Sequence, residues 1–295
     1  MSVKKTFSFG FFGAGMLALH TLEILDQKYG LRPNVIVTKP NKPRGRNLKL
    51  RISEIKAWAD SKKIPVYEPE TLKDATAQET LTKFSCEVFV VVSYGKIIPE
   101  EVLFLPKYKT LNIHPSLLPK YRGPSPIQSA ILSADKKIGV SLMLLDKEMD
   151  HGPILAQSAL EMDPLKETAQ DLSVSVAIEG SGLIAEKIPE FISGNIIPLP
   201  QDDKKATYTK KIEKEDGEIF LSGDQKKNIL KFNAYLGWPG TYFFHNKNGK
   251  VIRVSVENAR YADGKFILER VKPEGKNEML FEEFVRGYGN PYKEN

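Results

Sequence analysis

One run of apolar residues limits the fold more than any other feature of the chain. Val88–Ser93 reads Val-Phe-Val-Val-Val-Ser, with no alternation between apolar and polar positions. A strand with this pattern is covered on both faces, which is typical of a central strand in a parallel sheet between helices. Strand-like and helix-like patterns alternate through the first half of the chain, so we expect an α/β sheet. The other predicted strands in this half are Thr6–Gly13, Asn34–Thr38, Ile64–Tyr67, Thr110–His114, Gly139–Leu145 and Ile154–Leu160.

The composition changes at Asn195–Lys205, which is rich in proline and charged residues and poor in apolar ones. Beyond it, a helix pattern precedes short strands joined by two-residue turns, which suits a small β-barrel. A chain of 295 residues has room for about two domains. We therefore predict one domain at 1–194, a linker at 195–205 and a second domain at 206–295. The predicted elements of the second domain are the helix Gly223–Tyr235, the strands Thr241–His245, Lys250–Tyr261 and Lys265–Val271, and the turns Asn248-Gly249 and Asp263-Gly264.

Charge and cysteine content exclude several classes of protein. The 43 Lys and Arg residues exceed the 37 Asp and Glu residues by six, which permits an acidic partner without requiring one. Cys86 is the single cysteine, which excludes an intramolecular disulfide and a metal site built from several cysteines. The apolar run Phe7–Leu19 contains three glycines and so favours a strand and turn over a secretory signal. No uncharged apolar stretch approaches the ~20 residues of a membrane span, so we expect a cytoplasmic protein.

The first predicted strand leads into Gly13-Ala14-Gly15-Met16-Leu17-Ala18, which matches the glycine fingerprint of dinucleotide-binding proteins. Such glycines let a pyrophosphate approach the N-terminus of a helix. The acidic residue expected about 20 positions later is missing, because the second strand ends at Thr38-Lys39. Lys39 or Arg44 could instead suit a 2′-phosphate. An NADP-dependent oxidoreductase therefore stays open as an alternative, beside a tight turn that binds no nucleotide.

The densest group of chemically active side chains follows the strand Thr110–His114. Asn112 and His114 are two residues apart, so they point to the same face of that strand. An amide can donate to a developing oxyanion and an imidazole can handle a proton, a pairing suited to acyl transfer. Asp150 follows the next strand, and a carboxylate beside an imidazole fixes its tautomer. Spacing alone leaves a second interpretation open, in which Asn112 and Asp150 satisfy turn backbones and His114 is a half-buried strand end.

These residues lie in segments that resemble the folate-dependent formyltransferases. The resemblance is carried by N-I-H-P-S-L-L-P-K-Y-R-G-P-S-P-I-Q at 112–128 and M-D-H-G-P-I-L at 149–155. Within this superfamily the chain especially resembles the methionyl-tRNA formyltransferases. The narrower resemblance rests on T-K-P-N-K-P-R-G-R (38–46), A-T-Y-T-K-K-I (206–212), F-N-A-Y-L-G-W-P-G-T (232–241) and F-E-E-F-V-R-G (281–287). It covers nearly the whole chain.

The resemblance implies a Rossmann-like domain with a mainly parallel sheet, followed by a small β-rich domain of the OB-like barrel type. It implies transfer of formyl from 10-formyltetrahydrofolate to the amino group of methionyl-initiator tRNA, with no metal and no nicotinamide. We expect a monomer, although the sequence does not determine the oligomeric state. The family's catalytic Asn-His-Asp trio corresponds to Asn112, His114 and Asp150. The implied folate-binding residues are Ser116, Leu117, Leu118, Pro119, Tyr94, Gly95 and Lys96.

A basic segment suggests where a tRNA would bind. Lys39–Arg51 holds six basic residues and no acidic one, and two prolines and Gly45 favour an exposed loop. In isolation such a run is more often a solvated loop. Beside the family resemblance we interpret it as a clamp on the acceptor stem through phosphate and 2′-OH contacts. The predicted tRNA-binding residues are Arg44, Lys42, Arg46 and Lys49, and lysines of the second domain offer a further basic surface.

Three alternatives remain at this stage. A formyltransferase acting on an amino-sugar nucleotide would share the central segment but would not need the basic loop. An NADP-dependent oxidoreductase would use the Gly13 turn. A general RNA-binding protein would use the basic surfaces alone, and substitutions at His114 would then have no effect.

Overall fold

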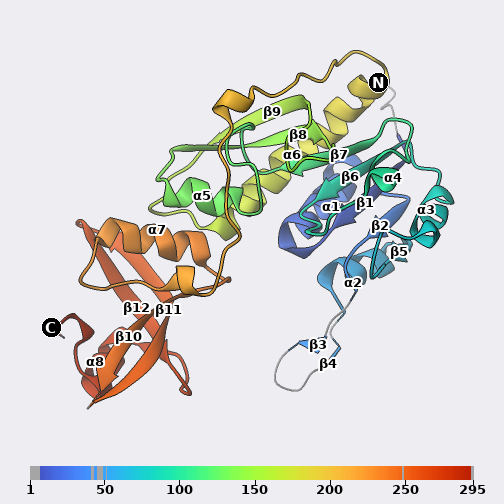
Figure 1. Ribbon diagram of the computed structural model, residues 1–295. Helices are drawn as coiled ribbons and strands as arrows, with labels where there is room; N and C mark the ends of the chain where they lie inside the picture. The colour runs from blue at the N-terminus through green and yellow to red at the C-terminus, as the bar shows by residue number, and fades with distance from the viewer. Residues whose placement is uncertain (1–6, 41–42, 45–48, 51, 248, 294–295) are drawn as a thin grey trace. The chain divides into compact units, whose positions relative to one another are not determined.

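The computed structural model describes residues 7–40, 43–44, 49–50, 52–247 and 249–293 (Figure 1). At 43–44, 49–50 and 293 it describes the backbone only. The chain divides into two compact units. The first is Met1–Pro124, Gly139–Leu160 and Ser173–Tyr208, and the second is Ser125–Ile138, Glu161–Leu172 and Thr209–Asn295.

Within the described residues, a seven-stranded sheet forms the centre of the first unit, in the order β5-β2-β1-β6-β7-β8-β9. β6 is the fourth strand, is parallel to both neighbours and is buried at every position. The prediction of a mainly parallel sheet around this apolar run is therefore confirmed. β8 runs antiparallel to β7. The strands are β1 (Phe9–Gly13), β2 (Val35–Val37), β5 (Val66–Tyr67), β6 (Val88–Val92), β7 (Thr110–His114), β8 (Lys137–Leu144) and β9 (Ile154–Glu161).

Helices cover both faces of this sheet (Figure 1). On one face Phe89 and Val91 of β6 share an apolar cluster with Ala77 and Leu81 of α3 and with Val102 of α4. On the other face α6 lies against β7 so closely that a Cβ at Gly180 would lie 3.0 Å from Ile113. The helices of the first unit are α1 (Gly15–Tyr29), α2 (Glu54–Ser61), α3 (Ala75–Thr82), α4 (Glu100–Leu103) and most of α6 (Ala169–Ile192), whereas α5 (Pro126–Leu132) belongs to the second unit.

The basic segment contains a short antiparallel pair of strands, β3 (Pro43–Arg44) and β4 (Lys49–Leu50), with Arg44 opposite Lys49. Of the predicted tRNA-binding residues, Lys42 and Arg46 lie outside the described residues.

The second unit is rich in β-structure, as predicted. Its described strands form an antiparallel sheet in the order β10-β11-β12-β13, and α7 packs on β11 and β12. Asp263 and Gly264 both have positive φ, 52° and 75°, as a tight hairpin turn requires. The other predicted turn includes Asn248, which lies outside the described residues. The elements are α7 (Gln225–Tyr235), β10 (Thr241–Lys247), β11 (Lys250–Ala262), β12 (Lys265–Pro273), β13 (Met279–Leu280) and α8 (Phe281–Tyr288).

An aromatic and aliphatic core holds the second unit together. Phe284 of α8 is fully buried and packs between Phe243 of β10 and Tyr288. In the described ranges, no helix of either unit combines the length and the hydropathy that a bilayer span requires.

Candidate active site

The carboxyl end of β7 places an amide and an imidazole side by side. Ile113 points towards α6, so the residues on either side of it, Asn112 and His114, point to the opposite face. Both are buried, with 8% and 4% of their surfaces exposed. In open parallel sheets, ligands bind outside the carboxyl ends of the strands. The predicted pair is therefore located where this type of sheet binds ligands.

His114 is held between two oxygen acceptors. Its Nε2 lies 2.9 Å from the carbonyl oxygen of Tyr121, and its Nδ1 lies 3.6 Å from Oδ1 of Asp150. A carbonyl oxygen can only accept, so Nε2 carries the proton in this contact. Nδ1 then faces the carboxylate, which can fix the orientation of the ring. This arrangement is suited to catalytic chemistry on a bound substrate.

Asp150 is fixed by its backbone as well as by its neighbours. Its φ is +52°, in the left-handed region that side-chain-bearing residues seldom occupy. Its Oδ2 accepts a 2.7 Å hydrogen bond from the backbone N–H of Gly123. Two residues on, a Cβ at Gly152 would lie 2.0 Å from the carbonyl oxygen of Leu144, so only glycine fits there. The loop therefore has one tightly defined path past His114.

The Asn112 amide is uncommitted. Among the residues that the structure describes, none exchanges a hydrogen bond with this side chain. A buried amide with free N–H groups at a strand end can donate to an oxyanion without first breaking another contact.

A buried arginine joins this loop to a distant segment. The Arg122 guanidinium is 2% exposed and donates to Gln201 Oε1, to Asp203 Oδ1 at 2.8 Å and to the Tyr208 hydroxyl at 3.3 Å. Burial disfavours its charge, but the hydrogen bonds to Asp203 and Tyr208 raise the pKa of Arg122 above its ordinary value. The same contact with Arg122 lowers the pKa of Asp203. We refer to residues 199–208 as the strap.

The strap also forms backbone hydrogen bonds with the loop that follows β7. Thr207 accepts from the N–H of Arg122 at 2.8 Å and donates to the carbonyl of Pro119 at 3.2 Å. Leu199 exchanges two hydrogen bonds with Ile154 at the start of β9. Residues that the sequence predicts as part of a linker therefore build one side of the site.

His151, the residue after Asp150, contacts both Asp146 in its own loop and the strap. Its Nδ1 lies 2.9 Å from Asp146 Oδ2 and its Nε2 lies 3.5 Å from Asp203 Oδ2. The hydrogen bond with Asp146 raises the pKa of His151 above its ordinary value of 6.5.

Side chains of β8 and β9 hold the predicted folate-binding loop through hydrogen bonds. The Ser141 hydroxyl accepts from the N–H of Leu118 and donates to the carbonyl of Ser116, at 3.1 and 2.6 Å. Gln157 donates to the carbonyl of Leu118 at 3.0 Å. Leu117 lies directly over Gly139, where a Cβ would lie 2.3 Å from it. Contacts within the protein therefore define the path of this loop.

The second predicted folate segment follows β6. Gly95 has a φ of +62°, and the Lys96 ammonium donates to the carbonyls of Pro69 and Glu70 at 3.1 and 3.0 Å. Burial raises the pKa of the Tyr94 phenol to about 12, so this group stays protonated.

Similarity to known proteins assigns the chain to a family. A family model described as formyl transferase matches residues 12–188. A methionyl-tRNA formyltransferase of Chloroflexus aurantiacus is 40% identical over 250 residues, which covers 84% of this chain and 80% of that protein. Another, of Thermodesulfovibrio yellowstonii, is 34% identical and covers 94% of both chains. The chain belongs to the methionyl-tRNA formyltransferase family. The enzyme class follows from the family: the protein is a folate-dependent formyltransferase.

A solved structure agrees on the fold. The methionyl-tRNA formyltransferase from Clostridium thermocellum superposes with a TM-score of 0.64 at 18% identity, and the match covers 90% of this chain and 98% of that one. The family assignment removes the oxidoreductase hypothesis. At the glycine fingerprint, a Cβ at Gly13 would lie 2.8 Å from Ala18 of α1, so this glycine serves close packing of strand and helix.

The structure brings some of the predicted residues together. His114 and Asp150 are in contact, and Asn112 shares their strand end with His114. Sequence reasoning missed Arg122, Gln201 and the strap as parts of the site. Within the described residues, no group of three or more His, Cys, Asp or Glu side chains could hold a metal ion.

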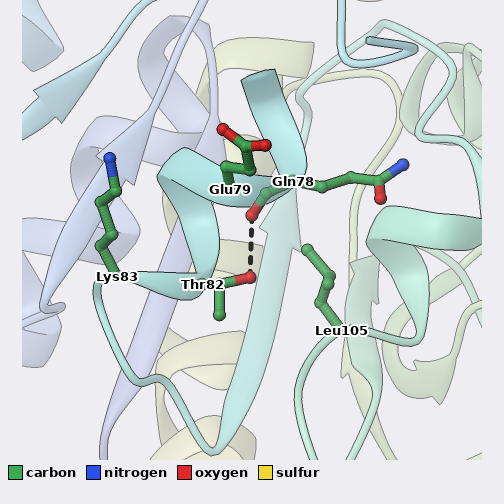
Figure 2. A pocket seen from close by; sticks show the side chains of 5 residues that line it. All are labelled: Gln78, Glu79, Thr82, Lys83 and Leu105. Atoms are coloured by element: carbon green, nitrogen blue, oxygen red, sulfur yellow. Dashed lines mark hydrogen bonds between the residues drawn. The ribbon is translucent and has the colours of Figure 1, made fainter. Parts of the chain in front are cut away.

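A surface hollow elsewhere on the first unit holds none of the predicted site residues. It lies along α3 and is lined by Gln78, Glu79, Thr82, Lys83 and Leu105 (Figure 2). The Thr82 hydroxyl turns back to the carbonyl of Gln78 at 2.8 Å, so it serves the helix itself.

Proposed function

We propose that this protein transfers a formyl group from 10-formyltetrahydrofolate to the amino group of methionyl-initiator tRNA in the cytoplasm. The observation that carries the proposal is the contact between His114 and Asp150 beside Asn112, in a chain of this family. We further assign residues 1–194 to the catalytic domain and 206–295 to a tRNA-binding barrel, and expect a monomer.

In the proposed reaction the uncharged methionyl amine attacks the formyl carbon. A carbon–nitrogen bond forms, and the carbonyl electron pair moves to oxygen and gives a tetrahedral oxyanion. When the intermediate collapses, the bond from carbon to N10 of the folate breaks, and the proton lost by the amine is taken up at N10. Asn112 donates to the oxyanion, and His114 supplies positive charge beside it.

The contact between His114 and Tyr121 suggests how the imidazole acts. Nε2 holds its proton on the Tyr121 carbonyl, while Nδ1 faces Asp150. To reach the oxyanion, the Nε2 proton must exchange that carbonyl for substrate. Catalytic hydrogen bonds often form only in the complex with substrate, so the Tyr121 contact is a resting position for the ring.

The folate is proposed to bind along Ser116–Pro119 and Tyr94–Lys96. Since the Lys96 ammonium is committed to two carbonyls, we expect backbone groups of this segment to meet the ligand. The tRNA is proposed to meet the basic segment through Lys42, Arg44, Arg46 and Lys49.

The proposal is tested by incubating the protein with charged initiator tRNA and 10-formyltetrahydrofolate. We expect formylmethionyl-tRNA to appear, and an amino-sugar nucleotide added as competitor should remain unformylated. Formylation of the sugar in preference to the tRNA would contradict the proposal.

The role of the basic segment is tested by salt. Each phosphate contact that is lost reduces the slope of log affinity against log salt by about 0.7–0.9. Arg44→Ala should therefore raise KM for the tRNA and flatten its salt dependence, with KM for the folate unchanged. An unchanged slope would remove Arg44 from the tRNA contact.

A further inference from the structure

Gln201 in the strap makes four hydrogen bonds that connect the buried arginine to the catalytic loop. Its Nε2 donates to the carbonyl oxygens of Asp150 and Gly152, both at 2.8 Å. Its Oε1 accepts from Nε and Nη2 of Arg122, at 3.1 and 2.9 Å. A carboxamide has two N–H donors and two lone pairs on oxygen, so this side chain uses its full capacity.

The orientation of the Gln201 amide follows from its partners. If the amide were reversed, its oxygen would face two carbonyl oxygens and its NH₂ group would face the guanidinium. Each of the four contacts would then pair an acceptor with an acceptor or a donor with a donor. The network therefore permits only one orientation of this side chain.

Arg122 gives the amide a rigid anchor. Its guanidinium is held by Asp203, and its backbone N–H by the carbonyl of Thr207. Because Arg122 is only 2% exposed, loss of these partners would leave its buried charge uncompensated. The position of the Gln201 oxygen is thereby set, and with it the position of the Gln201 nitrogen.

The Nε2 group of Gln201 holds the loop between β8 and β9 at Asp150, where the backbone is strained. Asp150 has positive φ, which costs free energy in a residue with a side chain. The Asp150 carbonyl belongs to the peptide unit that directly follows the Asp150 Cα, and the Gly152 carbonyl lies two residues further on, so both contacts hold the backbone that leaves Asp150. A shift of about 1 Å in a catalytic group can reduce turnover about 10²-fold.

We propose that Gln201 is a positioning residue that holds the Asp150 carboxylate at its working distance from His114. This inference rests on the proposed function, in which Asp150 orients His114. Gln201 does not touch the reacting atoms and acts through Asp150 alone. The strap is accordingly part of the catalytic apparatus of the first unit.

The chain contains a matched control for this arrangement. In the second unit Gln225 Nε2 donates to the carbonyls of Leu221 and Gly223, both at 2.8 Å, and its Oε1 accepts from the N–H of Phe266 at 3.2 Å. The local hydrogen bonding is nearly the same as that of Gln201, but it contacts no residue of the predicted trio. An effect on kcat that is seen only at Gln201 must therefore come from the groups that its amide contacts, the Asp150 loop and Arg122.

The test uses Gln201→Glu, which keeps both acceptors for Arg122 and removes both donors to the loop. We expect kcat to fall about 10–100-fold, with KM for tRNA and for folate within about twofold of wild type. Gln225→Glu should leave kcat within about twofold and lower the melting temperature at least as much as Gln201→Glu. If Gln201→Glu does not fold, Gln201→Met replaces it, because Met keeps the shape of the side chain.

The decisive arm introduces Gln201→Glu into the Asp150→Asn protein. If Gln201 acts only through Asp150, kcat of the double variant equals that of Asp150→Asn within about twofold. An additional loss equal to that seen in the wild-type background would overturn the inference, as would a normal kcat for Gln201→Glu. Near-normal turnover of Asp150→Asn itself would instead show that the proposed role of Asp150 is wrong.

Discussion

Two buried histidines, one in each unit, allow the proposed catalytic environment to be compared with a structural one. His114 ends β7, and His245 lies in β10; they are 4% and 1% exposed. Each ring uses Nε2 in a hydrogen bond with a backbone carbonyl, that of Tyr121 at 2.9 Å and that of Tyr288 at 2.8 Å. Burial and a carbonyl contact are therefore common to both and cannot identify the catalytic ring.

The two rings differ in what lies beside them. His114 faces the carboxylate of Asp150, whereas His245 packs edge-on against the ring of Phe284, 5.2 Å between centroids. A carboxylate can hold an imidazole in one orientation beside a substrate, and an aromatic edge in an apolar core offers no such partner. We infer that the first ring is placed for catalysis and the second to fasten α8 to the sheet of the second unit.

The largest expected effect tests this difference directly. His114→Ala should lower kcat about 10²–10⁴-fold, because the transition state loses a positively charged group. His245→Gln keeps a donor for the Tyr288 carbonyl, and at saturating tRNA its kcat should stay within about twofold of wild type while its melting temperature falls. Turnover measured under single-turnover conditions and thermal unfolding provide the two readouts. A similar kcat loss in both variants would erase the distinction.

Two buried asparagines extend the comparison and give the next largest effect. Asn112 keeps its amide uncommitted, whereas Asn233 of α7 donates to the carbonyl of Pro164 at 2.9 Å. Asn112→Ala should lower kcat about 10²–10³-fold, as loss of an oxyanion donor does, with little change in stability. Asn233→Ala should cost about 1–3 kcal/mol of unfolding free energy and leave kcat unchanged. Stability is measured by urea denaturation and activity by initial rates. A large loss of kcat in Asn233→Ala, or a large loss of stability in Asn112→Ala, would contradict the comparison.

The smallest expected effect concerns His151 at the outer edge of the site. The raised pKa of His151 means that its pairing stabilises the fold fully below the ordinary pKa of 6.5, and that this stabilisation is lost as the pH rises through the raised pKa. The side chain is 34% exposed, so screening limits the contribution to about 0.5 kcal/mol. His151→Gln should therefore be less stable than wild type near pH 5.5 and equal to it near pH 9, measured by urea unfolding. A difference that grows with pH would contradict the assignment.

The sequence predicts the centre of the fold well because apolar patterns are local. The run around Val88–Val92 predicts a buried central strand, and Asp263-Gly264 predicts a hairpin turn from conformational preference alone. Helix α8 has no such signal, because Leu280 at its start cannot cap it with a side-chain oxygen. There the Glu283 carboxylate, three residues later, accepts from the N–H of Leu280.

The site could be predicted only in part. Asn112 and His114 are two residues apart on one strand, and their spacing is visible in the sequence. Gln201 lies 79 residues from Arg122 in a polar, proline-containing segment that has the composition of a linker. Only the fold brings these two together. The resemblance at 206–212 was the one signal near this segment, and it indicated a family rather than a contact.

The central claim is that Asp150 and the buried imidazole beside it drive formyl transfer to methionyl-tRNA. It is tested most directly by the single-turnover transfer of labelled formyl from 10-formyltetrahydrofolate to charged initiator tRNA, with wild type and Asp150→Asn compared at saturating concentrations of both substrates. We predict labelled formylmethionyl-tRNA with wild type and a rate about 10²–10⁴-fold lower with Asp150→Asn. Equal rates for the two proteins, or no label on the tRNA with wild type, would contradict the account.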